Sequence, residues 1–205
     1  ILIVLFCGLK NQLLAYFEKD TLTLNVAKTI FGAIPDDGKD DVPGIQKAID
    51  SARIWLSHNA GKSVAKIYFP EGVYLVKSYT RNPRGYWTNY AVSIYSGIIL
   101  EGAGNKASVI KVADHLFDSL NVKDPCANAN IFYGVKITDV AFRNLTIDMN
   151  GINNLVPSRM FCDTVKNEIA IKVDGGSNLH IEKITIKNSA GRNHISVNGN
   201  GNGFT

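Results

Sequence analysis

Short apolar segments recur in this chain at fixed offsets, and this repetition restricts the possible folds more than any other feature. Residues 171–178 read IKVDGGSN and residues 195–202 read ISVNGNGN, so that Val173 and Val197 correspond at an offset of 24 residues. A unit of strand, turn, strand, turn in this size range is typical of a β-solenoid, in which each coil buries its apolar side chains against the next. The chain is therefore expected to be all-β and to form a parallel β-helix.

A second correspondence supports the same coil. Residues 142–150 read FRNLTIDMN and residues 181–189 read IEKITIKNS, at an offset of 39 residues, which we interpret as one repeat plus an insertion between Gly151 and Asn167. Because successive strand residues point to opposite faces, the alternation predicts inward side chains at Ile169, Ile171, Val173, Leu179, Ile181, Ile184 and Ile186. The residues predicted to point to solvent are Lys172, His180, Thr185 and Lys187.

Glycine and asparagine occur at the ends of these strands and in the turns between them. The chain holds 18 glycines, and both residue types tolerate the positive φ angles that tight turns require. Asn150, Asn178, Asn188 and Asn198 fall at strand ends. Their side chains are expected to bond turn backbone or to stack between coils.

One amphipathic helix is predicted near the start of the repeats. Residues 30–52 run from a Gly/Asp turn into a segment with start signals at Asp40 or Asp41 and at Pro43. Its apolar face consists of Ile45, Ala48, Ile49, Ala52 and Leu56. A stack of parallel strands has an open apolar end, so we expect this helix to act as a short N-terminal cap.

The charge pattern bears on the class of partner. The net charge is +4, and no block of five like charges occurs in the sequence, so a nucleic-acid partner has little support. A mildly basic surface suits an acidic polymer such as a uronate polysaccharide, while lysines scattered over solvated faces are the alternative interpretation.

The two ends of the chain carry separate expectations. Residues 1–6 are uninterrupted apolar residues, and we interpret residues 1–20 as a signal-peptide remnant or N-terminal anchor. This stretch is broken by Lys10 and is too short to span a bilayer, so a secreted or cell-surface protein without a membrane span is expected. Residues 21–205 are assigned to the β-helix domain, and further coils are expected beyond Thr205.

Three cysteines are present, and none has the spacing of a zinc ligand set. Cys7 lies in the apolar start, which leaves Cys126 and Cys162 either to form one disulfide or to remain separate.

Longer motifs carry a family resemblance. FGAIPDDGKDD, IQKAIDSA, IYFPEGVYLV and GIILEGAGNKASVIKV together resemble the N-terminal signature of the pectate-lyase-like superfamily, which includes rhamnogalacturonase-type enzymes, alginate epimerases and phage tailspike depolymerases. The resemblance covers residue 26 to the end of the chain and implies a right-handed parallel β-helix that handles a polysaccharide.

One coil is also similar to the alginate C5-epimerases. Residues 145–153, LTIDMNGIN, resemble a coil of those enzymes. The next coil reads SAGRNHISV at residues 189–197, where the epimerases carry a clustered Tyr, Asp and His. The Tyr and Asp are absent from this run and His194 is displaced, so the resemblance does not extend to that cluster.

Four residues are candidates for catalysis. Cleavage of an acidic glycan by β-elimination needs a base beside C5 and a cation on the neighbouring carboxylate, and His194 and Arg192 could fill these roles. Hydrolysis needs two carboxylates, for which Asp148 and Asp174 are the candidates because each ends a strand that successive coils would stack along one groove. Surface turns or bonds to turn backbone are the alternative roles of all four.

A polar loop is the candidate substrate-binding rim. Residues 81–90 carry Arg84, Tyr86, Trp87 and Tyr90, and aromatic faces stack on sugar rings while arginines pair with carboxylates. Packing over the first coils is the alternative.

No metal site is predicted, because no DxDxDG-like loop occurs and the clustered Asp36, Asp37, Asp40 and Asp41 fit turn and helix-cap roles. Calcium remains possible as a cofactor if the protein is a lyase. Two function classes follow: a secreted polysaccharide lyase or glycoside hydrolase acting on pectin, rhamnogalacturonan or alginate, and a non-catalytic β-helix that binds carbohydrate or acts as an adhesin.

Overall fold

A computed structural model of the chain describes residues 21–59, 64–80, 89–116, 129–154, 168–189 and 194–198. Its strands are β1 (Thr21–Asn25), β2 (Val64–Phe69), β3 (Gly72–Val76), β4 (Asn89–Ser93), β5 (Ile98–Gly102), β6 (Ser108–Val112), β7 (Ala129–Arg143), β8 (Thr146–Asp148), β9 (Glu168–Glu182), β10 (Thr185–Lys187) and β11 (Ile195–Asn198). A helix, α2 (Val42–His58), and a short 3-10 turn, η1 (Gly151–Asn153), complete the regular structure of the described residues.

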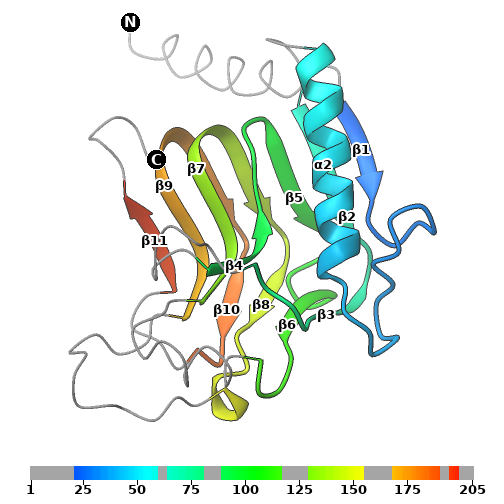
Figure 1. Cartoon of the computed structure of the whole chain (residues 1–205), viewed down its shortest axis with the longest axis vertical. Helices are drawn as coiled ribbons and strands as arrows, with labels where there is room; N and C mark the ends of the chain where they lie inside the picture. The colour runs from blue at the N-terminus through cyan, green and yellow to red at the C-terminus, as the bar shows by residue number, and fades with distance from the viewer. Residues whose placement is uncertain are drawn as a thin grey trace, which may run out of the picture.

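The strands pair in parallel from one coil to the next (Figure 1). Within the described residues, one sheet of seven strands has the order β1-β2-β5-β7-β9-β11 with β4 also beside β7, and a second sheet of four strands has the order β10-β8-β6-β3. Both predicted correspondences are observed, because Val173 pairs with Val197 and Ile147 pairs with Ile186. The parallel β-helix expected from the repeats is confirmed.

The two longest strands each supply two sides of the coil. β7 pairs with β4 along its first residues and with β5 along its last residues. Between these two parts the backbone of β7 has positive φ at Lys136 and Asp139, and β9 has positive φ at Gly175, Gly176 and Asn178. A side chain on Gly176 would place its Cβ 1.9 Å from the carbonyl oxygen of Ile137, so this corner requires glycine. With the second sheet as the third side, each coil has three sides.

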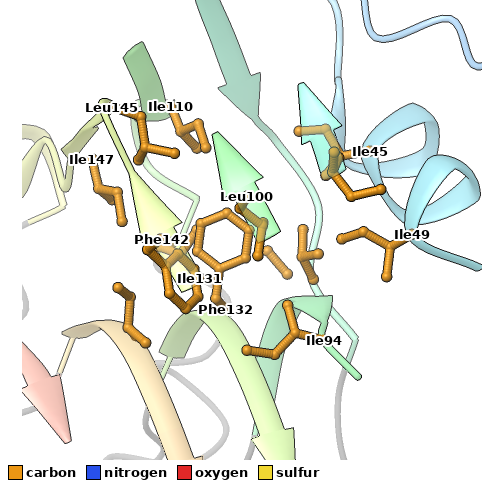
Figure 2. Packing of buried hydrophobic residues seen from close by; sticks show 14 of the residues in the cluster. Ile45, Ile49, Ile94, Leu100, Ile110, Ile131, Phe132, Phe142, Leu145 and Ile147 are labelled. Carbon is orange, nitrogen blue, oxygen red and sulfur yellow. The ribbon is translucent and has the colours of Figure 1, made fainter. Parts of the chain in front are cut away.

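Helix α2 covers one end of this coil stack, as predicted. It packs against β1, β2, β4 and β5, and Ile45, Ala48, Ile49 and Ala52 are fully buried. Figure 2 shows Ile45 and Ile49 directed towards the same interior that Leu100, Phe132 and Phe142 fill. The cap therefore continues the apolar core of the coils.

Asp40 and Asp41, which precede helix α2, connect the start of the helix to β3 and to the residue that follows β3. The Asp41 side chain makes no cap hydrogen bond to the helix; its Oδ2 accepts the Leu75 N–H at 2.7 Å. Oδ1 of Asp40 accepts the N–H groups of Val42 at 3.3 Å and Lys77 at 2.9 Å. The turn role expected of these aspartates is confirmed, because they fasten the cap to the second sheet.

Most inward predictions are confirmed. Ile169, Ile171, Val173 and Leu179 are buried. Ile181 pairs with the buried Phe142 but is 38% exposed, because among the described residues β11 covers only Ile171–Asp174 of β9. The predicted burial of Ile181 is therefore wrong even though its direction is right. Asn150, Asn178 and Asn188 all adopt positive φ at coil corners, as their turn roles require.

Several predicted positions lie outside the described residues: residues 1–20, Cys126, Cys162, Arg84, Tyr86, Trp87 and Arg192. In the part of the chain that the structure describes, no helix has both the length and the apolar character needed to cross a membrane.

Candidate functional site

One group of polar side chains lies on the outward side of the sheet formed by β4, β7, β9 and β11. The register places Ser93, Tyr133, Lys172 and Ser196 side by side across these four strands. The next outward row, two residues further along, consists of Val135, Asp174 and Asn198. Strand alternation puts both rows on the face opposite to Val173, which is fully buried in the core.

Asp174 is the centre of this group. Its Oδ2 accepts the Tyr133 hydroxyl at 2.9 Å and lies 3.6 Å from the Lys172 ammonium. Its Oδ1 accepts the side-chain amide of Asn198 at 2.9 Å. Three neighbouring strands therefore converge on one carboxylate, and its side chain remains 29% exposed. We call Tyr133, Lys172, Asp174 and Asn198 the Asp174 cluster.

Lys172 is a functional candidate that sequence reasoning missed. It points outward as predicted, but it is only 7% exposed rather than solvated, so the prediction of a solvent-facing lysine is wrong. The neighbouring side chains explain the burial: the ammonium lies 5.8 Å from the centre of the Tyr133 ring and pairs with Asp174. A lysine is rarely buried unless it is paired.

Tyr133 and Tyr90 form the aromatic side of the site. Their rings stack with centroids 5.5 Å apart and an interplanar angle of 29°. Burial, followed by the hydrogen bond to Asp174, raises the pKa of Tyr133 to about 12. The phenol therefore stays protonated at neutral pH, and its O–H donates the hydrogen bond to Asp174. Of the four loop residues predicted to bind substrate, Tyr90 is the one within the described part, and it stands beside the cluster.

His194 lies immediately before β11, at the edge of the same surface. Its carbonyl accepts the N–H groups of Ala170 at 2.9 Å and Ile171 at 3.4 Å, and the residue is exposed. The strand that follows pairs Ser196 with Lys172 and Asn198 with Asp174. His194 is thus anchored by its backbone next to the Asp174 cluster.

Asp148 lies elsewhere. It ends β8 in the second sheet, whereas Asp174 lies in the first sheet, so the expectation that the two carboxylates share one groove is wrong. The physical reason is the coil corner at Asn144, which has a positive φ and sends the chain into a different side before Asp148 is reached. The Asp148 carboxylate bonds Asn150 N at 3.0 Å and Asn188 Nδ2 at 2.9 Å, and lies 3.4 Å from the Lys187 ammonium.

The described residues hold no group of three or more His, Cys, Asp or Glu side chains arranged to bind a metal ion. The Asp174 cluster contains a single carboxylate, and a lysine ammonium already lies beside it. These residues therefore do not provide the oxygen-rich ligand set in which calcium is ordinarily bound.

The fold and this cluster define a class: a parallel β-helix with a lysine, an aspartate and a tyrosine gathered on the outward side of one sheet. The family model described as rhamnogalacturonase A/epimerase, pectate lyase-like matches residues 23–205. The chain belongs to this family, and the resemblance seen in its sequence is confirmed.

Curated relatives include both enzymes and a binding protein. Mannuronan C5-epimerase AlgE3 of Azotobacter vinelandii is 30% identical over 151 residues, which cover 74% of this chain and 6% of the relative. Plasmin and fibronectin-binding protein A of Streptococcus pneumoniae is 27% identical over 175 residues, which cover 84% of this chain and 22% of that protein. The chain thus spans less than a quarter of the length of either relative.

Solved structures agree on the fold. The A-module of the Azotobacter vinelandii mannuronan C-5 epimerase AlgE4 matches with a TM-score of 0.57 and 22% identity over 88% of this chain and 42% of that one. The AlgE6 A-module matches with a TM-score of 0.58 and 23% identity over 85% of this chain and 40% of that one. At this level of identity the likeness establishes the β-helix and nothing finer.

Proposed function

We propose that this chain forms part of a secreted enzyme that binds an acidic polysaccharide across the Asp174 cluster and removes the C5 proton of a uronate residue. The observation that carries the proposal is the convergence of Lys172, Tyr133 and Asp174 from neighbouring coils on one carboxylate-centred site. Family membership and the mannuronan C5-epimerases among the relatives support an acidic polymer.

The first chemical requirement is a cation. The C5 proton of a uronate becomes acidic enough to remove only when the adjoining carboxylate is neutralised. Lys172 supplies a positive charge in a nearly buried position, where its field is screened less than on an open surface. Asp174 holds the ammonium 3.6 Å away and so fixes it in place before substrate arrives.

The second requirement is a base and an acid on either side of C5. His194 is exposed beside the cluster, and an imidazole nitrogen can accept a proton, so it is assigned as the base. Tyr133, whose pKa is raised to about 12, is assigned as the proton donor. Delivery of that proton to the opposite face of C5 inverts the sugar, whereas delivery to the departing O4 oxygen cleaves the chain by elimination.

The tyrosine and aspartate that are absent from residues 189–197 are thus provided by earlier coils. Tyr133 comes from β7 and Asp174 from β9; β9 pairs with β11, the strand that follows His194, and β7 lies on the other side of β9. This arrangement supports the C5 chemistry that an epimerase and a lyase share. The two carboxylates that the sequence suggested for hydrolysis, Asp148 and Asp174, lie in different sheets, which favours proton abstraction over hydrolysis in this proposal.

The experiment follows deuterium into the polymer. The protein is incubated in D₂O with mannuronan, polygalacturonate or rhamnogalacturonan, and C5 deuterium, unsaturated-product absorbance and reducing ends are measured together. We expect C5 deuterium without cleavage from an epimerase, or an absorbance rise from a lyase. New reducing ends without either signal would contradict the proposal and indicate a hydrolase.

A matched pair of lysine variants tests the site itself. Lys172→Met should lower kcat/KM by at least about 100-fold, because it removes the charge that neutralises the substrate carboxylate. Lys66→Met is the control, since Lys66 pairs with Glu101 at 3.2 Å on another side of the coil. Equal activity in the two variants would remove Lys172 from the site.

A non-catalytic binding role is the second candidate, and the similarity to plasmin and fibronectin-binding protein A favours it. In that case the protein would retain acidic polysaccharide or a host protein on a column but leave all three chemical signals at background. Detection of the protein in the culture medium or at the cell surface would agree with both candidates and would test the proposed location.

A further inference from the structure

A hollow of about 390 Å³ lies over the second sheet, away from the Asp174 cluster. It is lined by Leu75 and Lys77 from the β3 end of the sheet and by Lys111, Ala113 and Asp114 from the β6 end. Figure 1 shows β3, β6, β8 and β10 side by side as a separate side of the coil. We call this feature the β3–β6 hollow.

Two ammonium groups belong to this hollow. Among the described residues the Lys111 ammonium makes no hydrogen bond or close ion pair, although the neighbouring strand places Asp148 directly beside Lys111 in the register and its charge helps to lower the pKa of Asp114. The Asp148 carboxylate pairs instead with Lys187 at 3.4 Å. The Lys77 ammonium donates to the carbonyl oxygen of Gly38 and keeps two further protons for other acceptors.

Asp114 is a fixed acceptor at the same place. Its Oδ1 accepts the side-chain amides of Asn150 at 2.7 Å and Asn153 at 3.1 Å. The hydrogen bond from Asn150, followed by that from Asn153, lowers the pKa of Asp114, so the carboxylate is ionised at neutral pH. Within the described chain Oδ2 of Asp114 accepts no hydrogen bond, and it remains available to a ligand hydroxyl.

The combination of groups restricts the ligand. Two lysines alone would attract any anion, but an ionised carboxylate in the same hollow repels a multiply charged one and accepts hydrogen bonds from hydroxyl groups. Leu75 and Ala113 add apolar surface, on which the C–H face of a pyranose ring can rest. A sugar with one carboxylate and several hydroxyls matches all of these groups.

We propose that the β3–β6 hollow is a second binding site for a single uronate residue of an acidic polysaccharide, separate from the Asp174 cluster. The carboxylate of the sugar binds Lys111 and Lys77, and its hydroxyls donate to Oδ2 of Asp114. The choice of polymer rests on the proposed function, whereas the site itself rests on the groups that line the hollow. A second site on a different side of the coil would hold the polymer by avidity while the Asp174 cluster acts on another stretch of it.

Calorimetry with a mannuronan trisaccharide tests the number of sites. We expect two sites per chain in the wild type and one in Lys111→Met, while Lys106→Met keeps both because Lys106 is an exposed turn residue outside the hollow. Unchanged thermal unfolding of the two variants shows that binding rather than folding has been altered. Two remaining sites in Lys111→Met would overturn the proposal.

The Lys172→Met variant separates this proposal from the proposed function. It should lose the site at the Asp174 cluster and keep the one in the hollow. A wild type with one site, lost in Lys172→Met and kept in Lys111→Met, overturns the hollow and leaves the proposed function standing. The reverse pattern supports the hollow and contradicts uronate binding at the Asp174 cluster.

Two further probes test the chemistry of recognition. Mannotriose, which has the hydroxyls without the carboxylates, should not occupy the hollow. Asp114→Asn should bind the trisaccharide at least about tenfold more weakly in the hollow and inorganic phosphate more strongly, because the repelling charge is gone. Equal binding of mannotriose, or weaker phosphate binding by Asp114→Asn, would contradict the assigned roles.

Discussion

Asp148 and Asp174 lie on different sides of the coil, yet each is part of the same kind of ladder, by which we mean a carboxylate that bonds an asparagine side chain of the next coil and lies beside a lysine. Oδ1 of each carboxylate accepts the side-chain amide of an asparagine from the next coil, Asn188 and Asn198 respectively, at 2.9 Å in both cases. Oδ2 of each lies within 3.6 Å of a lysine ammonium. Position just before a coil corner and charge therefore do not distinguish the two aspartates.

Their remaining contacts do distinguish them. Asp148 also accepts the backbone N–H of Asn150 at 3.0 Å and has a side chain only 10% exposed, so it holds its own turn. Asp174 instead accepts the hydroxyl of Tyr133, and its side chain is 29% exposed. In this coil stack, the hydrogen bond from its own turn is thus the feature that separates Asp148 from Asp174, the centre of the proposed site.

The largest expected loss of stability tests the stacking that both ladders need. Val173 is fully buried between coils, so Val173→Asp would place an unpaired charge in the core and lower the free energy of unfolding by at least about 4 kcal/mol. Val197, its partner on β11, is only half-buried, and Val197→Asp should cost less. Urea denaturation of both variants measures the difference, and equal stability of the Val173 variant and the wild type would contradict the inward assignment.

Removal of Asp148 should have the next largest effect. Asp148→Ala leaves the Asn150 N–H, the Asn188 amide and the Lys187 ammonium without their acceptor, and we expect a loss of about 3 to 4 kcal/mol. Asp148→Asn should lose less, since an amide oxygen can still accept from Asn150. Both variants should keep polysaccharide binding at the Asp174 cluster when measured well below their melting temperatures. Loss of that binding in folded protein would contradict the purely structural role assigned to Asp148.

A third carboxylate adds a pH-dependent case. Burial, opposed by the hydrogen bond from Leu75 and reinforced by Asp37 and Asp40, raises the pKa of Asp41 from 3.8 to about 6. A raised pKa means that the folded state prefers the protonated carboxyl. The contribution of Asp41 to the free energy of unfolding is therefore fully present below about pH 4 and is lost as the pH rises through about 6.

Asp41→Asn measures this contribution. The amide oxygen can still accept the Leu75 N–H, so the variant should gain about 2 to 3 kcal/mol relative to wild type between pH 4 and pH 7 and stay constant above that range. Unfolding by urea at several pH values provides the comparison. A difference that does not change with pH would show that Asp41 is not penalised by burial.

The sequence predicted the coil, the cap and the turn asparagines because these depend on local periodicity. Val173 and Val197 lie in matching segments, and the apolar face of residues 45–56 repeats at helical spacing. The Asp174 cluster depends instead on register between coils, since Tyr133 and Lys172 are 39 residues apart in the sequence and are brought together by the pairing of β7 with β9. The alternation of Ile171, Lys172 and Val173 predicts a lysine that faces solvent. Lys172 is buried because it packs against Tyr133, a contact that the sequence pattern does not show.

The smallest effect on stability is expected at Asp174, and it completes the comparison. Its partners are side chains on the outward face rather than the backbone of its own turn. Asp174→Ala alone would leave the nearly buried Lys172 ammonium without its counterion, so the test is the double variant Asp174→Ala/Lys172→Met, which should lower the free energy of unfolding by less than about 1 kcal/mol. The double change removes the Lys172 charge and releases the Tyr133 hydroxyl from its fixed position, and it should therefore abolish C5 deuterium incorporation or polymer binding. Asp148→Ala is the control, with the opposite pattern of large destabilisation and retained binding. If the two variants lose stability equally, the distinction between a structural and a ligand-facing ladder would not hold.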